Sequence, residues 1–179
     1  MDSDNATLDL DSDSLYICLT QLFGPPGRFH WSIYITDAQG LATQYQWAED
    51  LARCDRSAPV EKYSCSIVQP VKQRSETLQW NLAFIKMSHF VRTMDSDSYD
   101  ELFANIFTTS WASWKDNRQH GLSCRTWAIA ALQKLREKGG MRRLSAEQIA
   151  GLEAKIIAIG CAVEQRVAIG DNTVEMAEL

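Results

Sequence analysis

Two residues occupy positions at which their side chains could carry out nucleophilic chemistry. Cys124 follows Ser123, a favourable helix N-cap, at the start of a segment whose apolar spacing predicts a helix over residues 124–138. The first turn of a helix presents unpaired N–H groups and a partial positive charge, and both stabilise a thiolate. His30 lies within a predicted strand, and a neutral imidazole can accept the proton of a thiol. Together the two residues could attack a carbonyl through a thioester, with the helix N–H groups stabilising the oxyanion.

The first half of the chain has the composition and spacing of β-strands. In residues 28–36 the alternation places Phe29, Trp31, Ile33 and Ile35 on one face and His30 on the other. Turn residues separate this segment from its neighbours, which favours hairpin connections. The pattern predicts an antiparallel sheet of about five strands, over residues 15–23, 28–36, 41–47, 62–71 and 78–87.

The spacing of apolar residues becomes helical after residue 97. Ser98 and Glu101 have the spacing of a capping box, the helix at Cys124 ends at Gly139, and Ser145 opens a third helix that runs to about residue 167. Residues 111–121 are expected to form a connection. Strands followed by about three helices indicate an α+β fold. We expect one domain over residues 14–169, between an acidic, mobile tail (residues 1–13) and a polar C-terminal tail (residues 170–179).

The composition excludes several classes of protein. The net charge is −5, but five acids lie in the first 14 residues and three in the last nine, so the central part is mildly basic. Neither a secretory signal nor an apolar run of about 18 residues is found, and we therefore expect a cytosolic protein that does not contact a membrane. The five cysteines form no CxxC pair, which favours reduced thiols over zinc ligands, with Cys18, Cys65 and Cys161 in the core. No metal or cofactor motif is present.

Two stretches of the sequence resemble a known superfamily. FHWSIYITDAQG, and much later GLSCRTWAIAALQKL, look like the two halves of a circularly permuted papain-like domain. Lecithin-retinol acyltransferase-like proteins and permuted cysteine peptidases share this order of a His strand before a Cys helix. The chain also resembles small fungal proteins with a His-Trp strand and a Cys-x-x-Trp helix. The resemblance implies a cysteine-dependent hydrolase or acyltransferase with Cys124 as nucleophile and His30 as base.

Such sites usually contain a third polar group that orients the imidazole. Gln44 and Gln46 share one face of the next predicted strand, and Gln44 is our candidate for this group. The substrate-binding candidates are the tryptophans near these positions and one arginine: Trp31, Trp111, Trp114, Trp127 and Arg125.

Each candidate also has a structural interpretation. Cys124 could be a core thiol and His30 a hydrogen-bonded strand histidine, and His120 is an alternative base. The second hypothesis is therefore a non-catalytic binding module of papain-like shape, without a catalytic pair.

A basic cluster adds a further alternative. It could bind a polyanion such as tRNA or a phosphorylated carrier, so that the acyl substrate would be a small molecule or carrier-bound, or it could be a solvated helix end. With an acylated cysteine, tRNA binding would suggest an aminoacyl-tRNA-dependent transferase that makes a small peptide such as a cyclodipeptide. The cluster consists of Lys134, Arg136, Lys138, Arg142 and Arg143.

Overall fold

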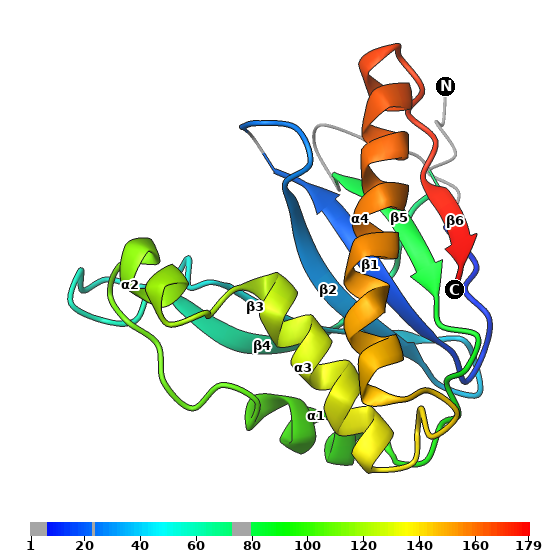
Figure 1. Ribbon diagram of the computed structural model, residues 1–179, viewed down its shortest axis with the longest axis horizontal. Helices are drawn as coiled ribbons and strands as arrows, with labels where there is room; N and C mark the ends of the chain where they lie inside the picture. The colour runs from blue at the N-terminus through cyan, green and yellow to red at the C-terminus, as the bar shows by residue number, and fades with distance from the viewer. Residues whose placement is uncertain (1–6, 23, 73–79) are drawn as a thin grey trace.

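The computed structural model describes residues 7–22, 24–72 and 80–179 and has the α+β fold that the sequence predicts. A six-stranded sheet has the order β4-β3-β2-β1-β5-β6, and α1, α3 and α4 lie against one of its faces (Figure 1). The elements in chain order are β1 (Leu15–Gln21), β2 (Phe29–Thr36), β3 (Ala42–Glu49), β4 (Glu61–Val68), β5 (Asn81–Lys86), α1 (Ser96–Ala104), α2 (Trp114–Gln119), α3 (Cys124–Glu137), α4 (Ala146–Ala168) and β6 (Glu175–Glu178).

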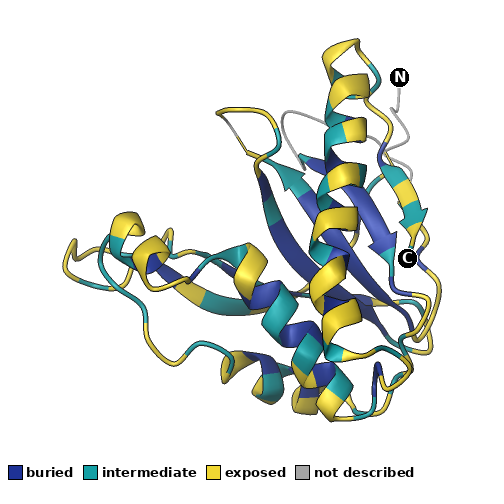
Figure 2. Ribbon diagram, viewed as in Figure 1, coloured by how far each residue is buried: buried dark blue, intermediate teal, exposed yellow. Residues whose placement is uncertain are grey.

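The main core lies between the sheet and the helices. The predicted apolar face of β2 is part of it, since Phe29, Trp31, Ile33 and Ile35 are all buried there. Figure 2 shows the central strands buried and the outward sides of α3 and α4 exposed. The alternation of side chains along β2 therefore decides which residues meet the helices and which face away from them.

The other face of the sheet is covered by a smaller core, to which the N-terminal segment contributes. Leu10 is buried against this face, the Leu8 N–H donates to Pro70 O at 2.8 Å, and Asp11 pairs with Lys86 at 2.7 Å. These contacts differ from the mobile tail expected for residues 1–13, because two leucines among the acids supply apolar area for packing. Residues 1–6 of that tail lie outside the described residues, as do Phe23 and residues 78–79 of the predicted strands.

The segment expected to be a polar tail, residues 170–179, contains β6. It pairs in parallel with β5, and Leu179 N–H donates to Lys86 O at 2.9 Å, so the sheet is mixed rather than purely antiparallel. β6 is only four residues long and contains two glutamates. Its pairing depends on the free edge of β5 rather than on its own strand propensity.

Each described helix begins after a capping side chain, and the sequence predicted one of these positions wrongly. Ser123 and Ser145 cap α3 and α4, as predicted, and the structure shows that both caps are capping boxes. The prediction for Ser98 is wrong, because the N-cap of α1 is Asp95, three residues earlier, whose side chain accepts the hydrogen bond of the Ser98 N–H at 2.8 Å. The connection predicted over residues 111–121 contains the short helix α2, which Ser113 caps.

The backbone pairing between β2 and β3 ends partway along the two strands. This division of the sheet positions the site. The two strands pair only from Thr36↔Ala42 to Ser32↔Gln46. Beyond that point β2 continues beside β1 alone, and β3 continues beside β4 alone. Figure 1 shows the two halves diverging, with the start of α3 at the division. None of the helices in the described part of the chain combines the length and apolar character that crossing a bilayer requires.

Gly160 sets how closely α4 approaches the sheet. A Cβ atom at this position would lie 2.7 Å from both Leu19 Cδ1 and Phe29 Cε2, whereas a Cβ at Gly151 on the same helix would meet nothing within 4 Å. Glycine at position 160 thus allows the helix to pack directly on β1 and β2.

We expect Gly160→Ala to destabilise the protein by about 1–3 kcal/mol, because the methyl group overpacks the contact with Phe29. Gly151→Ala is the matched control and is expected to stabilise the protein by about 0.5–1 kcal/mol through helix propensity. Urea unfolding of the two variants measures both effects. Equal effects of the two substitutions would contradict close packing at Gly160.

Candidate active site

Cys124 is the first residue of α3 and lies half-buried at the division of the sheet. Its thiol contacts Phe29 O, with a sulfur–oxygen distance of 3.9 Å. Burial favours the neutral thiol, but the interaction with the His30 side chain and its charge outweighs this effect, with help from the Trp31 N–H and the charge of Arg118. The pKa of Cys124 is therefore lower than that of an ordinary thiol, which is the property that a nucleophile needs.

His30 interacts with the same thiol from β2. Burial favours the neutral ring, but the hydrogen bond and charge of Cys124, the hydrogen bond of Gln46 and the charge of Glu61 together raise the pKa of His30. The pKa values of thiol and imidazole are thus shifted toward one another, which favours transfer of the proton from sulfur to the ring. Although His30 leaves β2 on the face opposite Phe29 and Trp31, the division of the sheet lets the ring reach the helix.

Gln46, and not the predicted Gln44, holds the imidazole. Gln46 Oε1 lies 2.8 Å from His30 Nε2. An amide oxygen can only accept, so Nε2 carries the proton and Nδ1 remains for the thiol. Gln44 instead donates to Ser32 Oγ at 3.3 Å. The reason is register, since Gln44 lies opposite Tyr34, four residues and roughly 13 Å along β2 from His30.

A pocket of about 240 Å³ opens beside Cys124. Its walls come from the start of β2, from α2 and α3, and from α4 through Ile157. Two of the predicted substrate-binding residues, Trp31 and Arg125, line it, and so do Arg28 and Arg118.

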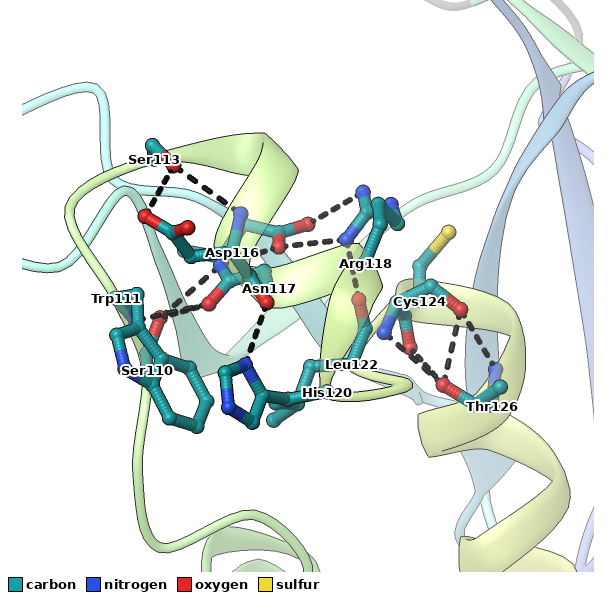
Figure 3. A network of polar contacts seen from close by, with 12 residues as sticks. Ser110, Trp111, Ser113, Asp116, Asn117, Arg118, His120, Leu122, Cys124 and Thr126 are labelled. Atoms are coloured by element: carbon teal, nitrogen blue, oxygen red, sulfur yellow. Dashed lines mark hydrogen bonds and ion pairs between the residues drawn. The ribbon is translucent and has the colours of Figure 1, made fainter.

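The other three predicted tryptophans lie elsewhere. Trp127 is fully buried in the core against Phe103, because it faces the sheet from the inner side of α3. Trp114 lies beneath the Arg118 guanidinium, 5.2 Å from its ring centroid. Trp111 stacks on His120 at 3.9 Å, on the side of Asn117 away from Cys124 (Figure 3). His120 Nδ1 lies 2.8 Å from Asp116 O, so the structure brings His30 and not His120 to the thiol.

A buried carboxylate, Glu61, anchors α2 beside the pocket, and the sequence analysis did not identify it. Glu61 is 2% exposed. It accepts from Arg118 Nη1 and Nη2 at 2.9 and 3.0 Å and from Asn117 Nδ2 at 2.8 Å. Asn117 in turn accepts from the Trp111 N–H, and Arg118 also donates to Leu122 O (Figure 3). This network fixes the Arg118 guanidinium next to Cys124. A lone glutamate at the start of a strand carries no sequence signal for such a role.

The basic cluster lies at the opposite end of α3. Lys138 is 14 residues from Cys124, which places it roughly 20 Å away along the helix. Lys134 pairs with Glu137 at 2.9 Å, and Arg142 and Arg143 are exposed. The structure therefore does not bring this cluster to the pocket. Within the described ranges no group of three or more His, Cys, Asp or Glu side chains could hold a metal ion.

The remaining cysteines differ in exposure. Cys18 is buried, and burial raises the pKa of its thiol to about 12. Cys161 is half-buried and Cys54 is exposed. Cys65 is exposed on the edge strand β4, so the expectation of a core position is wrong for this residue. All five thiols are free.

We expect Arg118→Gln to destabilise the protein by about 3 kcal/mol, because it leaves the buried Glu61 carboxylate without its counter-charge. Arg125→Gln, which breaks the exposed pair with Glu153, is the control and should cost less than about 1 kcal/mol. Denaturant unfolding distinguishes the two outcomes. If both variants unfold at the same denaturant concentration, Glu61 does not depend on Arg118.

Comparison of the chain with family models, with curated proteins and with solved structures gave no match.

Proposed function

We propose that the protein is a thiol-dependent acyl-transfer enzyme, a hydrolase or acyltransferase, in which Cys124 is the nucleophile and His30 the base. The observation that carries this proposal is the position of the Cys124 thiol at the start of α3, where it interacts with the half-buried His30 imidazole beside an open pocket. Gln46 is a positioning residue, because it acts on the substrate only through His30. The proposal requires no metal and no cofactor.

The reaction begins with transfer of the thiol proton from Cys124 Sγ to His30 Nδ1. The thiolate attacks the carbonyl carbon of an amide, ester or aminoacyl group, and the carbonyl electron pair moves to oxygen. Collapse of this intermediate breaks the bond to the leaving group, which takes its proton from His30. Water or an amine then attacks the thioester, gives its proton to His30, and releases the acyl product and the thiol.

The start of α3 offers donors for the oxyanion. The capping box uses the N–H groups of Ser123 and Thr126. In the described part of the chain the N–H groups of Cys124 and Arg125 have no protein acceptor, so they are available to a substrate oxygen. Stabilisation of the oxyanion at a helix N-terminus is a large contribution to acyl transfer.

Two alternatives from the sequence have less support. A binding module predicts a thiol enclosed by apolar side chains, whereas Cys124 lines a pocket. Aminoacyl transfer from tRNA would use the basic cluster, which lies far from Cys124 along α3. Five free thiols are compatible with the cytosolic location expected from the sequence.

We expect iodoacetamide at pH 6.5 to alkylate Cys124 faster than the exposed Cys54 and Cys65, by about tenfold for each unit of difference in thiol pKa. Peptide mass mapping over time measures the three rates. His30→Gln should abolish the difference, because it removes the proton acceptor. Equal labelling of Cys124 and the two exposed thiols in the natural protein would overturn the proposal.

A second prediction concerns the imidazole. Gln46→Ala removes a hydrogen bond that raises the pKa of His30, so the imidazolium is less stable and the thiolate should form at higher pH. The pH profile of Cys124 alkylation should shift upward by up to about one unit. Gln44→Ala removes the neighbouring glutamine on the same strand face and should leave the profile in place. If the pH profile of alkylation shifts equally in both variants, Gln46 has only a structural role and does not position His30.

A further inference from the structure

We infer that the Cys124 pocket selects small acyl donors that carry an anionic group, a carboxylate or a phosphate. This inference rests on the proposed function, since it concerns the substrate of that same site. It is carried by three arginines, Arg28, Arg118 and Arg125, which reach the pocket from three different parts of the fold.

Arg118 is a preorganised donor. Its contacts to Glu61 and Leu122 occupy both N–H groups of Nη1 and one of Nη2. Since a guanidinium has five N–H donors, the contacts among the described residues leave the Nε–H and one Nη2–H for a ligand. The Glu61 pair fixes the plane of the guanidinium, which lowers the entropy lost when an anion binds.

Arg28 adds a positive charge to the lining of the pocket. It is exposed, directly precedes β2, and within the described residues has no carboxylate partner. Arg125 lines the pocket from α3, and its Nε lies 3.2 Å from Glu153. Glu164, a further acid near the pocket, accepts the Gly27 N–H at 2.8 Å.

The charges of the side chains around the pocket favour an anionic ligand. The charged residues that line the pocket are arginines, whereas Glu61 and Glu153 are their partners and do not line it. Figure 3 shows the Cys124 sulfur on the side of α3 that faces Arg118. An anionic group on the acyl donor could therefore pair with a guanidinium while its carbonyl lies at the thiol.

The size of the pocket limits the substrate. At about 240 Å³ it is smaller than the roughly 300–1,000 Å³ typical of sites for drug-sized ligands. It fits a short acyl chain that ends in an anionic group, or the corresponding end of a larger molecule.

Iodoacetate and iodoacetamide provide matched probes, because they react with thiols in the same way and differ in charge. We expect the ratio of iodoacetate to iodoacetamide rates to be about fivefold higher at Cys124 than at the exposed Cys54, owing to attraction by the arginines. The ratio at Cys124 should fall in Arg28→Gln. It should remain unchanged in Lys115→Gln, the control, which removes an exposed positive charge of α2 that does not line the pocket.

Protection of Cys124 from alkylation distinguishes a carboxylate ligand from a phosphate ligand. Succinate or inorganic phosphate should slow the alkylation of Cys124 by iodoacetamide, and the more effective of the two identifies the preferred group. If Cys124 reacts rapidly with iodoacetamide but shows neither a preference for iodoacetate nor protection by either anion, the inference is overturned and the proposed function stands. If Cys124 reacts no faster than Cys54 with iodoacetamide, the proposed function fails, and this inference with it.

Discussion

The separation of β2 from β3 is the constraint on which the site depends. A continuous ladder would keep His30 on one side of the sheet and the helices on the other. Because pairing stops at Ser32↔Gln46, the backbone opens and the first turn of α3 reaches the imidazole. The same opening leaves Gln46 at the last paired position, from which its amide meets the ring diagonally. One interruption of hydrogen bonding thus brings together thiol, imidazole and amide.

The opening must itself be held in place, and a second buried polar group does this. Glu61, at the start of β4, binds Arg118 and Asn117 of α2, and α2 precedes the loop that leads to Cys124. A buried carboxylate is costly unless it is paired and hydrogen-bonded, so this network disfavours arrangements in which α2 leaves β4. Arg118 takes part in this network and also lines the pocket.

The parts of the fold that could be predicted from sequence are those decided by near neighbours. The alternation of β2 and the cap at Ser123 depend on adjacent residues, and both are confirmed. The choice between Gln44 and Gln46 depends on the register of two strands, which the shared strand face does not specify. The burial of Glu61 depends on α2, whose six residues are too short for a periodic pattern. The places of Trp111, Trp114 and Trp127 likewise depend on tertiary packing, since a tryptophan near a cysteine in sequence can face the core or the solvent.

Two segments that are distant in sequence, one before β1 and one after α4, meet at one residue. Lys86 binds the Asp11 carboxylate through its side chain and the Leu179 N–H through its carbonyl. This meeting point is on β5, and β1 separates β5 from the strand that carries His30. One residue of β5 thus fastens both the segment before β1 and the segment after α4, away from the strand that carries the imidazole.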